Sequence, residues 1–235
     1  MSIELVGAGA GQAPGWFGKL PSHGDFLARR LPPAVRLCFD DWLQRGLLQS
    51  RTDLGDAWLP AWLASPLWRF VVAPGVCGAQ AWMGVLMPSH DRVGRCFPLL
   101  LMAAAGTAPL LADCLSVHED WFVRLEDLAL STLEERFSLE TLDTALMALG
   151  GAPVSGHGVR ACGALVQAPT AGAWETMTAG QLPALARVGL GPGQSAWWTA
   201  GAHKVAPCLA VCPGLPGARQ FAALLDGRWA RMNGE

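Results

Sequence analysis

The sequence predicts an α/β protein, with helices on both sides of a mixed, largely antiparallel sheet in a layered α-β-α sandwich. Three observations favour this fold. Short apolar runs bounded by turn residues follow one another between residues 67 and 103. Segments with helical spacing of apolar residues lie before and after these runs. The runs are almost continuously hydrophobic, which indicates strands buried on both faces.

The composition indicates one folded domain. The chain has 235 residues, of which 51% are hydrophobic and 15% charged. Disordered chains need the opposite balance, so that class is excluded. We expect a flexible Gly/Ala-rich lead over residues 1–14 and a single domain over residues 15–230. The net charge of −2 argues against a nucleic-acid binder. So few charges leave apolar surface, and large apolar patches often mark partner sites.

Cysteine usage and the N-terminal residues predict a soluble protein in a reducing compartment. The seven cysteines are an odd number scattered along the chain. We therefore expect reduced thiols packed as small hydrophobic groups, not a disulfide framework. The first residues lack the basic and apolar regions of a signal peptide. The uncharged run at residues 97–112 is shorter than the ~20 residues of a membrane-spanning helix.

The first half of the chain predicts two helices and then three strands. Pro33 can occupy the first turn of a helix that continues to about Leu48. A shorter helix carries apolar residues between 58 and 63. The strands are expected at residues 67–73, 81–87 and 97–103. Their short connections favour antiparallel pairing.

The second half predicts two helices, further strands and a closing helix. Apolar spacing indicates a long helix over residues 110–136. Ser138 can cap the next helix, which Gly150 ends. Strands are expected at residues 161–167, 195–199 and 205–211, and a last helix at residues 218–225.

Adjacent tryptophans and an acidic segment each leave two interpretations open. Trp197 and Trp198 point to opposite faces of a strand, so one is either covered by a helix or exposed as a recognition ring. Trp198 is the candidate contact. Residues 113–143 contain nine acidic and two basic side chains, a local charge of −7. This pattern fits a solvated helix face, or a site for a basic partner.

Two polar loops carry the candidate functional residues. Ser22, His23 and Asp25 resemble a hydrolase triad, but side chains so close in one loop seldom converge. A turn, with Gly24 in an unusual backbone conformation, is the simpler interpretation. A second loop contains the run Ser-His-Asp-Arg at 89–92. Its Arg92, together with Arg95, can bind an acidic group or pair with Asp91.

The remaining motifs do not assign catalysis, a cofactor or a metal. Three glycines at 7, 9 and 11 fail the dinucleotide fingerprint because residue 12 is glutamine. One histidine and two cysteines, at 203, 208 and 212, fall short of the four close ligands of structural zinc. His118 fits a core or boundary position. We therefore predict no catalytic residue, cofactor or metal ligand.

Five sequence blocks resemble the TagF (ImpM) family of type VI secretion-associated proteins. The first is GWFGKLPSHGDF at residues 15–26. SPLWRF at 65–70 and GVCG at 75–78 follow, and GVLMPS at 84–89 precedes DRVGR at 91–95. SAWWT at 195–199 and residues 221–227 match more loosely. The resemblance implies a cytoplasmic accessory factor that regulates the machine after translation, in some members as a repressor acting through a forkhead-associated scaffold protein.

Three hypotheses follow. The first is a non-enzymatic binding module whose contacts are Lys19, Ser22, His23, Asp25, Arg92 and Arg95, if the two loops meet, with Trp198 as a further candidate. The second is a hydrolase built on His23 and Asp25, with Ser89 or Cys77 as nucleophile within about 3.2 Å of His23. The third is a structural subunit of the baseplate.

Overall fold

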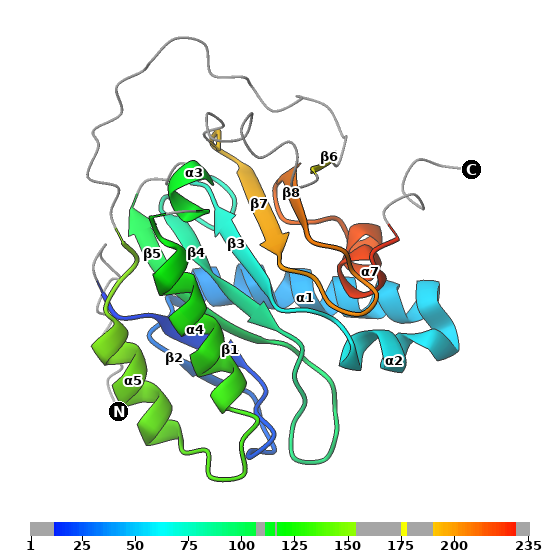
Figure 1. Ribbon diagram of the computed structural model, residues 1–235, viewed down its shortest axis with the longest axis horizontal. Helices are drawn as coiled ribbons and strands as arrows, with labels where there is room; N and C mark the ends of the chain where they lie inside the picture. The colour runs from blue at the N-terminus through cyan, green and yellow to red at the C-terminus, as the bar shows by residue number, and fades with distance from the viewer. Residues whose placement is uncertain (1–11, 107–110, 116, 154–174, 178–189, 229–235) are drawn as a thin grey trace.

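The computed structural model describes residues 12–106, 111–115, 117–153, 175–177 and 190–228. Its strands form one antiparallel sheet in the order β2-β1-β5-β4-β3-β7-β8-β6 (Figure 1). The predicted α/β class and antiparallel strand direction are confirmed. Every pairing between described strands is antiparallel, so none of the parallel pairs of a mixed sheet occurs among these residues.

The centre of the sheet follows the sequence prediction closely. The strands are β3 (Trp68–Val72), β4 (Ala81–Met87) and β5 (Leu99–Gly106), and β4 is buried at every position. Trp82 and Leu86 of β4 belong to one core cluster, whereas Met83, Val85 and Met87 belong to the other. Alternate side chains of a strand face opposite ways, so both faces of β4 are packed.

Different helices contribute to these two clusters. The first cluster takes its apolar side chains from α1 (Pro33–Leu54), α2 (Trp58–Leu63) and α7 (Ala218–Asp226), and the second from α4 (Glu119–Ser131) and α5 (Leu139–Leu149). Figure 1 shows α4 in front of the sheet and α1 behind it. A short 3-10 helix, η1 (Gly55–Ala57), joins α1 to α2.

Three short strands were missed by the sequence analysis, β6 and the two that lie beside the polar loops. β1 (Gly15–Gly18) pairs with β5, and β2 (Leu27–Arg29) pairs with β1 at the sheet edge. Each spans fewer than five residues, too few for a periodic pattern to be recognised. Strands β1 and β2 matter for the site because they place residues 19–26 beside the connection between β4 and β5.

The predicted helix at 110–136 was wrong in extent. It is divided into α3 (Leu111–Cys114) and α4, and α4 starts after His118. The His118 amide donates to Asp113 O at 2.8 Å, outside regular helical pairing. Buried residues keep a three- to four-residue spacing across this turn, so periodicity alone does not detect the break. Helix α1 likewise continues beyond the predicted end at Leu48.

The C-terminal predictions are mostly confirmed. Ser138 caps α5 by accepting the Thr141 amide hydrogen at 3.4 Å, and Gly150 follows that helix. Strand β7 (Gln194–Thr199) and helix α7 lie where expected, whereas β8 (Cys208–Pro213) starts later than predicted because Ala202 and Val205 form a separate bridge. The short β6 (Glu175–Met177) lies at the other edge of the sheet. The strand expected at 161–167 lies outside the described residues.

The prediction that all cysteines are reduced thiols was wrong. Cys38 of α1 and Cys77 of the β3–β4 connection form a disulfide across 39 residues of sequence. Sequence spacing did not predict the pair, because only the packing of α1 against the sheet brings the two positions together. Cys96, Cys114, Cys208 and Cys212 are free thiols.

Candidate functional site

The two polar loops singled out in the sequence meet at one end of the sheet. Residues 19–26 connect β1 to β2, and residues 88–98 connect β4 to β5. Gly18 pairs with Leu99, and Leu99 pairs with Met87, so the two connections leave the sheet at the same end of the strands. The Arg92 amide donates to His23 O at 2.9 Å, so the loops are joined directly.

Asp91 is the centre of this junction. Its side chain is fully buried and accepts from Lys19 Nζ at 3.0 Å and Arg95 Nε at 2.6 Å. The amide hydrogens of Val93 and Arg95 are donated to the same carboxylate, at 3.1 and 2.9 Å. Burial alone raises the pKa of Asp91, but these hydrogen bonds hold that pKa well below its usual range. The carboxylate therefore stays ionised and fixes both loops.

Lys19 and Ser89 belong to this internal framework. The Lys19 side chain is only 8% exposed, and its charge is paired with Asp91. Ser89 is buried, and its hydroxyl donates to Lys19 O at 2.8 Å. The structure therefore places Lys19 behind the surface that the sequence analysis expected it to form.

An aromatic group supports the same junction. Phe26 packs edge-on against Phe97 with ring centroids 4.7 Å apart and lies 6.1 Å from the Phe17 ring. Lys19 Nζ is 4.8 Å from the centroid of Phe26. Nevertheless Phe26 is 50% exposed, so part of its ring faces solvent. Sequence analysis did not select it, although it ends the first family-like block.

The exposed part of the junction combines cationic and apolar groups. We name it the loop surface and define it by its accessible side chains: Ser22, His23, Asp25, Phe26, Arg92, Val93 and Arg95. Val93 is 68% exposed at the loop tip. The Arg95 side chain is 62% exposed, although its Nη2 donates to Gly24 O at 2.6 Å. The surface therefore offers two apolar side chains beside two guanidinium groups.

The geometry does not assemble the hydrolase that the sequence left open. In the described chain, the hydrogen-bond partner of the His23 ring is Ser22, with Nδ1 and Oγ 2.8 Å apart. Neither Ser89 nor Cys77 bonds to His23, since Ser89 binds Lys19 O and Cys77 is in the disulfide. A general base must reach its nucleophile directly or through one water. Among the described residues, neither nucleophile has a direct hydrogen bond to His23.

This loop contains a turn, but the turn spans Leu20–His23 and not residues 22–25. The His23 amide donates to Leu20 O at 3.0 Å and closes a turn. Gly24, however, does not adopt a positive φ, contrary to expectation. A Cβ placed at Gly24 meets only the Arg92 side chain, at 3.9 Å. This glycine is therefore not required by backbone conformation.

Trp198 lies inside the protein, which corrects its choice as a surface contact. Its side chain is 5% exposed, and its ring lies 4.9 Å from Phe122 of α4. Trp197 faces the other core cluster, 5.0 Å from the Trp42 ring. The alternative in which helices cover both rings is the one observed.

Ion pairs occupy part of the acidic segment. Arg69 of β3 forms a bidentate pair with Glu126, at 2.8 Å to each oxygen, and binds Glu119 at 2.7 Å. Asp143 pairs with two consecutive arginines that follow β2, Arg29 and Arg30. These arginines lower the pKa of Asp143, although burial acts in the opposite direction. Part of the acidic segment is therefore used in ion pairs that hold α4 and α5 to the sheet.

The thiols and histidine considered for zinc do not form a metal centre in the described part of the chain. No group of three or more His, Cys, Asp or Glu side chains there could hold a metal ion. Burial raises the pKa of the Cys208 and Cys212 thiols to about 11, which disfavours the thiolate that metals bind. His118 is buried at the N-terminus of α4, as a core or boundary histidine is, and burial lowers its pKa.

None of the described helices has the length and apolar character needed to cross a bilayer.

Comparisons with known proteins cover both loops of the site. The family model described as "TagF N-terminal domain, Type VI secretion system-associated" matches residues 15–149. The crystal structure of PA0076 from Pseudomonas aeruginosa PAO1 is similar at a TM-score of 0.71 and 34% sequence identity. That match covers 92% of this chain and 95% of the other. A comparison with curated proteins found no match.

Proposed function

Because this chain belongs to the TagF family of type VI secretion system-associated proteins, we propose that it is a non-enzymatic regulator that binds a protein of that machine through the loop surface. The observation that carries this proposal is the junction of residues 19–26 and 88–98 around buried Asp91. The layered helices and sheet then serve as the scaffold that presents the two loops.

Preorganisation of the loop surface supports a binding role. Asp91 receives four hydrogen bonds from both loops, and Arg92 N bonds across to His23 O. A loop that is already ordered loses little conformational entropy when a partner binds. The same network would be unnecessary if the loops served only to connect strands, because a polar turn can be satisfied by water.

The composition of the loop surface supports protein recognition. Binding energy at protein interfaces is concentrated in a few aromatic, arginine and apolar anchors. Phe26 is half-exposed and Val93 is exposed, and both are apolar. Arg92 and Arg95 of the same surface are exposed cations. We propose that the two apolar groups enter a recess of the partner and that the arginines, with His23 and Asp25, orient it.

We further propose a forkhead-associated scaffold protein as the partner and a cytoplasmic, post-translational restraint on assembly or activation as the outcome. This part rests on the family resemblance. Regulation by binding needs differential affinity for two states of the partner. The protein would hold the scaffold in its inactive arrangement without changing it covalently.

Paired substitutions test this proposal. The variant Arg92→Glu/Val93→Asp reverses a charge and removes an apolar anchor on the loop surface. The control Arg36→Glu/Leu37→Asp makes the same chemical change at an exposed arginine and leucine of α1. Binding of the purified scaffold protein should weaken at least about tenfold for the first variant and remain near wild type for the control, because one lost hot spot is worth ~2 kcal/mol. Circular dichroism must show that both fold.

Wild-type affinity in the loop variant would refute the assignment of the surface. Turnover of a small molecule by pure protein, abolished by His23→Ala, would instead favour the hydrolase. Stoichiometric retention in purified secretion machines would favour a structural baseplate subunit, since a transient regulator is lost on purification.

A further inference from the structure

Cys38 and Cys77 connect two elements that have few other bonds between them. Cys38 lies on α1, and Cys77 lies in the connection from β3 to β4, here called the fastened loop and defined as residues 73–80. Their Cα atoms are 5.7 Å apart. In the described chain, the disulfide and a 3.7 Å contact of Cys38 Sγ with Val76 O are the covalent and polar links between this loop and α1.

The backbone hydrogen bonds at the tip of the fastened loop lie within the loop itself, from Gly75 N to Gly78 O and from Val76 N to Ala73 O. Apolar packing of Val76 and Cys77 and the disulfide connect the tip to the core. Gly75 and Gly78 adopt φ values of 92° and 122°, which glycine accepts without strain. A Cβ at Gly78 would contact nothing within 4 Å. The base of the loop is held separately, because Ala73 N bonds to Gln194 O and Gly193 N to Pro74 O. Opening the disulfide would therefore release the tip and leave the base attached to the sheet.

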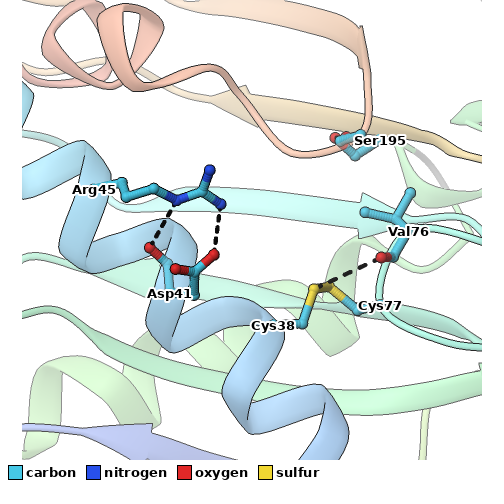
Figure 2. The surroundings of a disulfide bond; sticks show 7 residues. Cys38, Asp41, Arg45, Val76, Cys77 and Ser195 are labelled. Atoms are coloured by element: carbon cyan, nitrogen blue, oxygen red, sulfur yellow. Dashed lines mark hydrogen bonds and ion pairs between the residues drawn. A yellow bond between two sulfur atoms is a disulfide. The ribbon is translucent and has the colours of Figure 1, made fainter.

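Cys38 and the fastened loop line part of a pocket. Figure 2 shows the disulfide beside Val76, with Asp41 and Arg45 of α1 nearby. The pocket has a volume of about 360 Å³. Cys38, Gly75 and Val76 line one side, and the other sides come from α1 and from the turn that leads into α7. Asp41 and Arg45 of α1 form an exposed ion pair at 2.7 Å beside it. Movement of the fastened loop must change the shape of this pocket.

We propose that Cys38 and Cys77 form a reversible disulfide, opened by a cellular dithiol and closed by exchange with a cellular disulfide, that sets the position of the fastened loop and the shape of the pocket beside it. Cys38 is the half-buried partner, whereas Cys77 is 5% exposed. An attacking thiolate therefore approaches the Cys38 sulfur.

The exchange balances as two displacement steps. The reductant thiolate bonds to Cys38 Sγ, the Cys38–Cys77 bond breaks, and Cys77 leaves as a thiolate that takes up a proton. The second thiol of the reductant then displaces Cys38 and closes the oxidised dithiol. Two electrons and two protons have moved from the dithiol to the protein. The freed Cys38 thiol can donate to Val76 O, a much weaker link than the covalent bond.

Among the residues that the structure describes, the free thiols are poorly suited to compete in this chemistry. Burial raises the pKa of Cys114 to about 12 and that of Cys212 to about 11. Burial also raises the pKa of half-buried Cys96. Fewer thiolates at neutral pH mean slower exchange. Oxidation and reduction are thereby directed to the Cys38–Cys77 pair.

The test combines thiol trapping with hydrogen exchange on the full chain. Protein equilibrated with oxidised or reduced dithiothreitol is alkylated, and the modified cysteines are mapped by mass spectrometry. Reduction should add two alkyl groups, at residues 38 and 77. It should also speed amide exchange in residues 75–79 by about tenfold or more, whereas exchange in β4 stays unchanged. The double variant Cys38→Ser/Cys77→Ser should exchange like the reduced protein under both conditions.

A matched control replaces two free, half-buried thiols, as Cys96→Ser/Cys208→Ser, and should keep the redox response. Equal exchange of residues 75–79 in the oxidised and reduced proteins would overturn the proposal. Complete alkylation of Cys38 and Cys77 in the oxidising buffer would do the same. If the double variant fails to fold, the comparison of oxidised with reduced wild-type protein still decides.

Discussion

Replacing Gly46 with alanine sets helix propensity against packing. Gly46 lies in the interior of α1 and is buried against α7. In an exposed helix interior, Gly→Ala stabilises by about 1 kcal/mol. Here, however, a Cβ on residue 46 would be 2.5 Å from Cδ2 and 2.6 Å from Cγ of Phe221. The two effects have opposite signs, so their sizes decide the outcome.

The distances make packing the larger effect. Unstrained carbon contacts are about 3.5–4.0 Å, so the Phe221 ring must retreat by about 1 Å. It has little space, because Phe221 is 1% exposed and its ring already lies 5.5 Å from the Trp42 ring. Overpacking a core costs about 1–3 kcal/mol, and the depth of this clash favours the upper value. We therefore expect Gly46→Ala to lower the free energy of unfolding by about 2 kcal/mol.

Urea denaturation followed by tryptophan fluorescence measures this change, provided that the m-value is constant. Leu48→Ala and Leu48→Gly report propensity alone, because residue 48 is 71% exposed on the same helix. Phe221→Leu should relieve the clash, so the double variant should be more stable than the sum of the single effects predicts. A stabilisation by Gly46→Ala equal to the Leu48 difference would refute the packing argument.

Three further predictions concern the disulfide, the acidic groups and a helix cap. Cys38→Ser/Cys77→Ser should lower the free energy of unfolding by about 4 kcal/mol in oxidising buffer, from the entropy of closing a 39-residue loop, and urea denaturation should show no such loss in reducing buffer. Because the folded-state pKa values of Asp91 and Asp143 are lowered, the stability that both contribute is present above about pH 4 and is lost as pH falls below it. Thermal melts between pH 5 and 2 should therefore show a smaller fall in Tm for Asp143→Asn than for wild type. An equal fall in Tm would contradict the stabilising role of the Asp143 carboxylate. Ser138→Ala should cost about 1 kcal/mol by removing the cap of α5, with Ser138→Asp restoring it in the same denaturation assay.

Local sequence patterns were sufficient for the central elements. β4 was predicted at its observed bounds because seven apolar residues lie between turn residues. Pro33 and Ser138 marked helix starts through the backbone groups that a first turn leaves unpaired. A turn in the first polar loop was also predictable, although its hydrogen bond joins Leu20 and His23, two residues earlier than predicted. In each case, the interactions that determine the structure lie within a few residues of sequence.

Only the tertiary structure decided which side chains are accessible to solvent and which are paired by an ion pair or a disulfide. Lys19 and Trp198 were chosen as contacts but are buried, one by Asp91 and the other beside Phe122. Phe26 was not chosen, yet half of its surface is exposed.

The Cys38–Cys77 bond and the Lys19–Asp91 pair span 39 and 72 residues of sequence. Sequence by itself therefore determined the central strands, most of the helices and the family, but not the short strands or the break before α4. The candidate site, its buried ion pair and the disulfide were decided by contacts between distant segments. Burial and pairing depend on which elements the sheet places side by side.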